Sequence, residues 1–288
     1  MSGSGVGQRP ADAPVATQLL ASRPYELRIP PGLDRSRPAP LVIYLHGYGA
    51  DGAKLRDALD VAALARDRGF VYAVPEGTKE RPSGRRFWNA TPACCNFAGS
   101  TVDDVAYLAA VIDDARRRAA VDSGKVFVVG FSNGGFMAHR LACELSDRIA
   151  AIASIAGASS LDESTCRPTR PVAVLQVHGD ADPIVMYDGG HTLDRADLPR
   201  HPSAPDTVAA WARLDGCGPG EWVDEPIDLE ADVPGAETLV FRYSGCRDAA
   251  VELWRVRGGD HFVAQGRAAS ERIYDFLVAH ARPTSRHE

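Results

Sequence analysis

One serine lies between glycines where the local sequence pattern changes sharply, in the segment Gly130-Phe131-Ser132-Asn133-Gly134. The apolar run VFVV precedes it and an amphipathic helical pattern follows, which predicts a tight turn from a strand into a helix. Such a turn lifts the Ser132 hydroxyl out of the sheet and aims the helix N-terminus, with the Asn133 N–H, at a reacting oxygen. Small residues are needed on both sides because the turn is crowded. We interpret Ser132 as a nucleophile; the alternative is a plain strand-to-helix connection with a glycine turn.

A nucleophilic serine needs a base, and an acid that orients the base. When the serine lies on a strand–turn–helix segment, the acid comes after it in the sequence and the histidine comes after the acid. The segment VLQVHGDADPIVMY places Asp180 and Asp182 in a loop after a predicted strand, at the sheet edge where open α/β sheets bind ligands. We choose Asp182, because it lies deeper in the loop and is followed by the anchoring residues 183–185, and interpret Asp180 as turn-forming.

Eight histidines compete for the role of the base. His261, in LWRVRGGDHFVAQG, follows a predicted strand and a Gly-Gly turn, and it is our choice, with His191 second. The others have simpler interpretations, as turn formers after strands, as helix or tail residues, or as loop residues: His46, His178, His139, His280, His287 and His201.

A second oxyanion donor is expected from the loop in LVIYLHGYG, where two glycines let the backbone approach a ligand closely. The donor would be the main-chain N–H of Tyr48. A glycine-rich turn without a ligand is the alternative.

The elements that must position these residues alternate between strands and helices. Strands are predicted at 25–29, 41–45, 71–75, 126–130, 149–155, 172–177, 238–243 and 251–256. Helices are predicted at 52–68, 102–119, 134–145, 206–214 and 268–280. This alternation predicts an α/β fold with a mostly parallel central sheet and helices on both faces. We see no repeat and no linker, so we expect one domain over residues 23–282 between tails at 1–22 and 283–288.

Composition narrows the class of partner. The chain has 288 residues, 45% of them hydrophobic and 24% charged, with a net charge of −6. The negative charge disfavours nucleic acid and anionic membranes as partners. No apolar run approaches the roughly 20 residues of a membrane span. We identify no signal peptide in the first residues. The sequence contains no pattern that predicts the oligomeric state.

Four segments together resemble a known family: LHGYG, RFWNATPACC with VDDVAYL, GFSNGGFM and HGDADPIVMY. They are similar to the polyhydroxybutyrate depolymerase-type esterases of the α/β-hydrolase superfamily, a group that includes feruloyl and acetyl-xylan esterases. The resemblance runs from about residue 24 to 280. It implies an α/β-hydrolase fold without a large cap domain, and a location outside the cytoplasm.

The resemblance also implies roles for residues. Ser132, Asp182 and His261 would be nucleophile, acid and base, with Tyr48 and Asn133 supplying the oxyanion hole. One departure matters: where relatives show Gly-Gly-Gly-His and then Thr-Trp-Pro, this chain has GGDHF over residues 258–262. The added carboxylate beside the base could alter its titration, and the lost tryptophan could reshape the cleft.

Two aromatic side chains are candidates for substrate binding, Trp88 and Phe262. Trp88 lies in a loop expected near the cleft, where stacking on substrate and buried packing are equally plausible. The acidic pair at 103–104 starts a predicted helix, and we interpret it as a cap.

Six cysteines allow either disulfides or buried thiols, and none has the spacing of a zinc finger. By the resemblance, we expect Cys217 and Cys246 to be bridged. We expect Cys94 and Cys95 not to pair with each other, because an adjacent bridge strains the peptide. One of them would then reach Cys143 or Cys166.

The leading hypothesis is a serine carboxylic-ester hydrolase that works through an acyl-enzyme without metal or cofactor. Its substrates would be small or polymer-bound esters: short-acyl, hydroxyacid-polyester, or feruloyl and acetyl polysaccharide esters. The alternatives are a non-catalytic polymer- or carbohydrate-binding relative and a serine peptidase of the same superfamily. The connection 156–171 is short and polar, so no helical lid is expected and the site should lie in an open groove.

Overall fold

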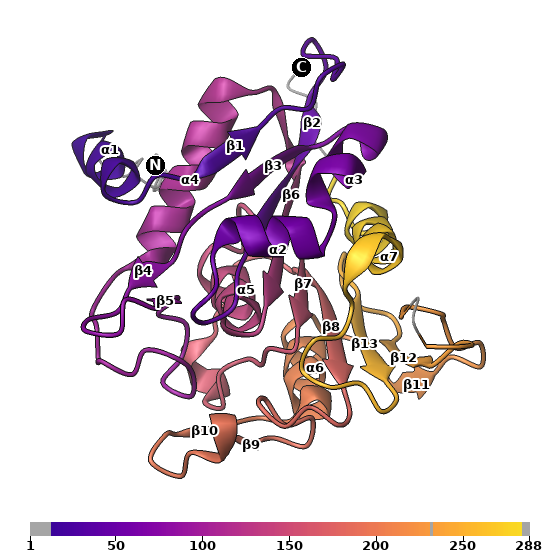
Figure 1. The fold of residues 1–288 in the computed structure, drawn as a ribbon. Helices are drawn as coiled ribbons and strands as arrows, with labels where there is room; N and C mark the ends of the chain where they lie inside the picture. Colours follow the sequence, from indigo (N-terminus) through magenta and orange to yellow (C-terminus); the bar gives the residue numbers. More distant parts are fainter. Residues whose placement is uncertain (1–12, 231–232, 284–288) are drawn as a thin grey trace, which may run out of the picture.

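The computed structural model describes residues 13–230 and 233–283, and its centre is a nine-stranded sheet (Figure 1). The strand order is β1-β3-β2-β6-β7-β8-β13-β12-β11. Neighbours from β3 to β13 run parallel, whereas β1, β12 and β11 pair antiparallel at the two edges. The predicted mostly parallel α/β sheet is confirmed.

The strands at the centre of the sheet are apolar and almost fully buried where they pair, in contrast to the edge strands β1 and β11. Their bounds are β1 Glu26–Arg28, β2 Ala39–Leu45, β3 Val71–Val74, β6 Val121–Phe131, β7 Ala151–Ile155, β8 Ala173–Gly179, β11 Gly220–Trp222, β12 Thr238–Tyr243 and β13 Val251–Val256. Burial on both faces explains why these strands are continuously apolar rather than alternating.

Helices cover both faces of the sheet, each face with its own apolar core. One face carries α4 Asp104–Arg118, α5 Asn133–Glu144 and α6 Ala204–Leu214. The other carries α2 Gly52–Ala58, α3 Val61–Arg68 and α7 Gly266–Ala279. The helix expected over 52–68 is therefore two helices, because Asp60 between them adopts a left-handed conformation with φ 48°.

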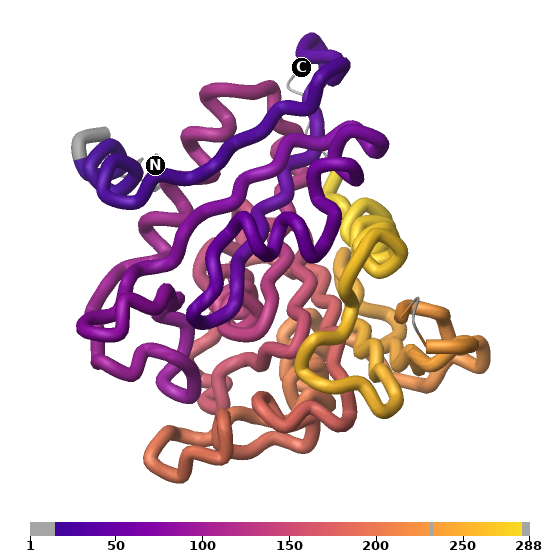
Figure 2. The backbone as a smooth tube through the Cα atoms, viewed as in Figure 1, coloured from indigo at the N-terminus to yellow at the C-terminus, as the bar shows by residue number. Residues whose placement is uncertain are grey.

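The N-terminal region differs from the expected tail over residues 1–22. Residues 1–12 lie outside the described part, but α1 (Ala13–Ser22) is a helix beside α4 (Figure 2). Its Leu19 and Leu20 pack against the main core, which accounts for its order. The expected C-terminal tail lies outside the described residues from 284 onward.

No helical lid follows β7, as expected. The connection to β8 holds only the 3₁₀ turn η1 (Glu163–Thr165), and the loop after β8 holds β9 (Gly190–His191), η2 (Thr192–Asp194) and β10 (Arg200–His201). The remaining short pair is β4 (Thr78–Lys79) with β5 (Arg86–Phe87). Across the described residues, no helix is both long and apolar enough to cross a membrane.

Three disulfides join the six cysteines. Cys217–Cys246 is bridged, as expected. The expectation for the other four is wrong: Cys94 pairs with its neighbour Cys95, and Cys143 pairs with Cys166. Cys95 has a φ of 110°, a backbone conformation that residues other than glycine rarely adopt.

Candidate active site

The turn between β6 and α5 has the geometry that its sequence predicts. Ser132 adopts φ 53° and ψ −120°, a conformation that is costly for a residue other than glycine. A Cβ on Gly130 would lie 2.0 Å from the Gly134 carbonyl oxygen, and one on Gly134 would lie 2.0 Å from the Leu45 carbonyl oxygen. The two glycines are therefore required by close backbone packing, and the surrounding structure holds Ser132 in a strained position.

Asp182 and His261 meet although 79 residues separate them in the chain. They follow β8 and β13, neighbouring parallel strands whose carboxyl ends lie at the same sheet edge. His261 Nδ1 donates to Asp182 Oδ2 at 2.7 Å, and both side chains are buried. The other carboxylate oxygen accepts from the N–H groups of Ile184 and Val185 at 2.8 and 3.0 Å.

These contacts determine the charge of Asp182. Burial by itself would raise the pKa of this carboxyl, but hydrogen bonds from His178 and His261 outweigh burial and hold the pKa far below its ordinary value. The group is therefore a carboxylate that can only accept. Asp180, in contrast, turns away to Arg255 and to the Gly258 N–H.

A cleft of about 440 Å³ brings several of the predicted residues together. Ser132, His261, Phe262 and Tyr48 line it, whereas His191 is not among its lining residues and bonds from Nδ1 to the Leu198 carbonyl. Most other lining groups are apolar or basic: Gly47, Ala50, Arg85, Cys94, Cys95, Phe97, Phe131, Ile184, Thr192, Leu193 and Arg195. No hydrogen bond joins Ser132 to His261 within the described part of the chain; such bonds are often long before substrate binds.

The loop that follows β2 contributes the second expected donor. His46 accepts from the Gly77 N–H at Nε2 and bonds to the Gly47 carbonyl through Nδ1, so it shapes the turn. Neither the Tyr48 N–H nor the Asn133 N–H donates to any acceptor among the described residues. Both donors are thus free for a ligand oxygen.

Trp88 is not a substrate-stacking residue, because its side chain is 0% exposed. Its indole Nε1 donates to the His46 carbonyl at 2.9 Å. Its main chain exchanges two hydrogen bonds with the Asn133 side chain, at 2.6 and 3.0 Å. Of the two interpretations of Trp88, buried packing is therefore the correct one. The residue links the two segments that carry the expected oxyanion donors.

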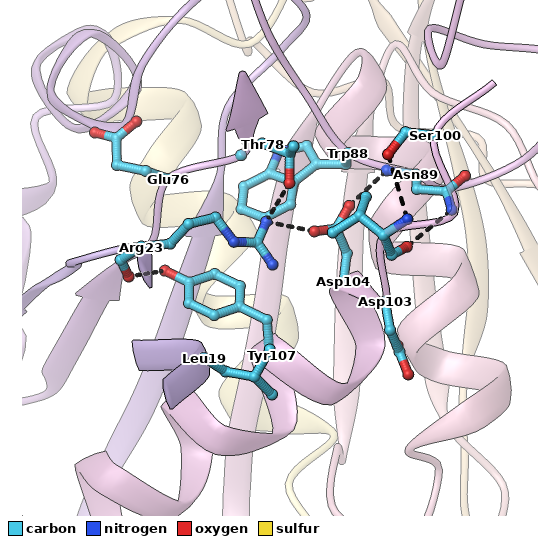
Figure 3. A network of polar contacts seen from close by, with 12 residues as sticks. Leu19, Arg23, Glu76, Thr78, Trp88, Asn89, Ser100, Asp103, Asp104 and Tyr107 are labelled. Atoms are coloured by element: carbon cyan, nitrogen blue, oxygen red, sulfur yellow. Dashed lines mark hydrogen bonds and ion pairs between the residues drawn. The ribbon is translucent and has the colours of Figure 1, made fainter. Parts of the chain in front are cut away.

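A buried ion pair supports the segment that carries Trp88 (Figure 3). Asp104 accepts from Arg23 at 2.5 Å and from the Asn89 N–H at 2.7 Å. The guanidinium lies 3.8 Å over the Tyr107 ring. Only Asp103 caps α4, accepting from the Ala106 N–H, so the cap interpretation of the acidic pair is wrong for Asp104. This network was not predicted from the sequence. The one feature that could have indicated it is the second aspartate, Asp104, because a helix cap needs only one.

The departure at residues 258–262 has a local structural explanation. Asp260 accepts from the Phe262 N–H at 2.7 Å, so its carboxylate is engaged within its own loop. Phe262 is 61% exposed, stacks on Phe131 at 5.7 Å and meets the His261 ring edge-on at 5.4 Å. It forms an apolar wall of the cleft. Among the described residues, no group of three or more His, Cys, Asp or Glu side chains is arranged so that it could hold a metal ion.

Comparison with known proteins adds the family. The sequence pattern of the phospholipase/carboxylesterase family matches residues 33–196. The chain is 36% identical over 259 residues to NocK of Nocardia uniformis subsp. tsuyamanensis, which carries the name of an esterase, covering 83% of this chain and 70% of that one. It is 28% identical to feruloyl esterase B of Piromyces equi over 88% of this chain, but spans only 45% of that protein.

Solved structures show the same fold. An acetyl xylan esterase from Aspergillus awamori has a TM-score of 0.60 at 18% identity, over 89% of this chain and 94% of that one. Esterase PE8 has a TM-score of 0.57 at 18% identity, over 89% and 98%.

Proposed function

This chain belongs to the phospholipase/carboxylesterase family of α/β-hydrolases, and we propose that it is a serine carboxylic-ester hydrolase working through an acyl-enzyme. Ser132 is the nucleophile, His261 the general base and then acid, and Asp182 the group that orients the imidazole. The observation that carries the proposal is the 2.7 Å bond from His261 to Asp182 beside a cleft that contains Ser132 on a strained turn.

The reaction follows from this arrangement. His261 Nδ1–H is held by a carboxylate, so Nε2 is the nitrogen left to take the Ser132 proton as Oγ attacks the ester carbonyl. Negative charge develops on the carbonyl oxygen, where the Tyr48 and Asn133 N–H groups and the α5 N-terminus stabilise it. Collapse expels the alcohol, protonated by His261. Water activated by the same base then hydrolyses the acyl-enzyme.

The cleft favours a class of substrate. Aromatic rings of Tyr48, Phe97, Phe131 and Phe262 line it, and the connection from β7 to β8 contains no α-helix that could serve as a lid. An apolar, open cleft suits esters of aromatic, short or hydroxy acids attached to bulky alcohols or polymers. The names of the feruloyl and acetyl xylan esterases among its relatives support this class.

The three disulfides support a location outside the cytoplasm, because such bonds persist in oxidising compartments. We further propose that ester substrates, rather than nucleic acid or membranes, are its partners. The net charge of −6 supports this.

The test is to compare Ser132→Ala with the unmodified enzyme on p-nitrophenyl acetate, methyl ferulate and hydroxybutyrate oligomers. We expect a loss on the order of a millionfold in kcat with unchanged folding. A phosphonate ester should label the unmodified protein once, at Ser132, as mass spectrometry would show. Full activity in the folded variant would refute the proposal.

A further inference from the structure

A chain of buried side chains leads from α6 through the core to the acid of the site. It runs from Trp211 through His139, Gln176 and His178 to Asp182. All five residues are at most 4% exposed. Buried polar groups of this kind are costly unless each one is satisfied, so the directions of their hydrogen bonds are constrained.

The first links have one possible direction. The Trp211 indole can only donate, so its 2.9 Å bond makes His139 Nδ1 an acceptor. Burial lowers the pKa of His139 to about 4, so its single proton is on Nε2. That N–H donates to Gln176 Oε1 at 3.0 Å. The orientation of the Gln176 amide follows directly.

The same logic determines the tautomer of His178. With its oxygen accepting, Gln176 uses its amide nitrogen to donate to the Gly157 carbonyl at 2.9 Å and to His178 Nδ1 at 3.1 Å. His178 Nδ1 is therefore an acceptor, and its proton lies on Nε2. This N–H donates to the Val185 carbonyl at 2.7 Å, and the same Nε2 lies 3.4 Å from Asp182 Oδ2.

Two imidazoles consequently face one carboxylate oxygen. Asp182 Oδ2 accepts from His261 at 2.7 Å, and the protonated His178 Nε2 lies 3.4 Å from the same oxygen. A second donor reduces the ability of this oxygen to stabilise a positive charge on His261.

The geometry points to His178 as a positioning residue for the proposed hydrolysis: it holds a protonated Nε2 beside Asp182 Oδ2, and Gln176 and His139 impose that tautomer. The inference rests on the proposed function, since it concerns how the acid serves the base. The turn-forming role expected for His178 from the sequence does not account for its buried contacts.

Other titratable groups around His178 come from several elements. The Tyr187 ring packs edge-on at 5.9 Å, and Arg255, the partner of His178 in the β13 register, lies 5.4 Å over Tyr187. Arg255 is paired with Asp180. His201 is a further titratable group near this site. Burial lowers its pKa, and the neighbouring His178 lowers it by a smaller amount. The substitutions below leave all four unchanged.

Two substitutions separate the effect of the His178 Nε2–H donor from the effect of the packing of this side chain. His178→Asn keeps a polar group at the Nδ1 position, facing Gln176, but has no donor at the Nε2 position. His178→Gln places an N–H near the Nε2 position. Activity should rise with pH as the base loses its proton, and its acidic limb should move upward in His178→Asn by about half a pH unit, because Asp182 then stabilises the protonated base more strongly. We expect His178→Gln to restore the midpoint.

The measurement is the pH profile of kcat/KM on p-nitrophenyl acetate, with thermal stability recorded beside it. A merely structural role would lower stability in both variants and leave both midpoints at the unmodified value, and that result would overturn the inference. If neither variant folds, ¹⁵N NMR of the histidines in the unmodified protein decides. His178 should show a protonated Nε2 and a bare Nδ1; the opposite tautomer refutes the inference.

Failure of this inference is distinguishable from failure of the proposed function. Ser132→Ala tests the reaction and leaves the tautomer of His178 untouched. An inactive Ser132→Ala together with the opposite His178 tautomer would keep the hydrolase and reject the positioning role.

Discussion

The Asn133 side chain and the Trp88 main chain form a reciprocal pair of hydrogen bonds, N–H to Oδ1 at 2.6 Å and Nδ2–H to the carbonyl at 3.0 Å. Because the Trp88 indole also holds the His46 carbonyl, one residue links the start of α5 to the loop after β2. The spacing between the two expected oxyanion donors thus depends on a side chain that does not reach the cleft.

Trp88→Phe should therefore lower kcat by about 10–100-fold, with KM for a small ester little changed, since the donors lose their alignment rather than their chemistry. Leaving the His46 carbonyl unpaired should also cost about 1–3 kcal/mol of stability. Steady-state kinetics and denaturant titration measure the two effects. Trp254→Phe is the matched control: it removes another buried indole donor, to Glu252, and should leave kcat unchanged. Equal kcat losses in both variants would contradict the prediction.

His261→Ala should reduce kcat on the order of a millionfold, as expected for loss of a triad base. His191→Ala should retain most activity, because His191 bonds to a loop carbonyl and does not line the cleft. Initial rates on p-nitrophenyl acetate compare the two. The reverse pattern would show that the base is misassigned.

Phe262→Ala should raise KM for an aromatic acyl ester such as methyl ferulate by about fivefold, through loss of an exposed ring that stacks in the cleft wall. KM for p-nitrophenyl acetate should change much less, because a short acyl group makes less contact with this wall. Trp222→Ala, which removes an exposed ring on β11, serves as the control. A parallel change with both esters would argue against a role in acyl recognition.

Cys217→Ser should lower the free energy of unfolding by about 3–4 kcal/mol on the chain-entropy view of a bridge that closes a loop of this size. The kinetics should not change, because neither Cys217 nor Cys246 lines the cleft. Thermal denaturation measures the loss, and Cys246→Ser should reproduce it. Six reactive thiols in unfolded, non-reduced protein would show that the bridge does not exist.

Asp215 gives the stability of the protein a pH dependence opposite to that of most carboxylates. Burial raises its pKa to about 7, well above the ordinary value of an aspartate, and Oδ2 has no hydrogen-bond partner among the described residues. A folded pKa above the unfolded value means that stability falls as pH rises from about 4 to 7 and then levels off. Asp215→Asn removes this loss and keeps an acceptor for the Val172 N–H.

We therefore expect Asp215→Asn to be more stable than the unmodified protein at pH 8, by on the order of 1–3 kcal/mol, and to lose that advantage near pH 4. Urea titrations at the two pH values measure it. An advantage that does not depend on pH would mean that Asp215 is ionised throughout.

Local patterns were sufficient for much of the architecture. The apolar runs predicted the central strands, and their alternation with helices predicted the parallel sheet, because burial on both faces leaves a direct mark on composition. The glycines around Ser132 predicted a crowded turn for a similar reason: a Cβ at 130 or 134 would meet backbone 2.0 Å away. Local patterns were insufficient at Asp60, where a single left-handed residue divides a continuous helical pattern.

The sequence by itself determined the fold class, the Ser132 turn and the candidates for acid and base, since each depends on residues near one another in the chain. The tertiary structure decided what depends on long-range contact. It brought Asp182 to His261 by making β8 and β13 neighbours, turned Asp180 outward, buried Trp88 and paired Cys94 with Cys95. No local pattern encodes which strands become neighbours or which polar groups are left to satisfy one another, because those outcomes follow from packing the whole chain.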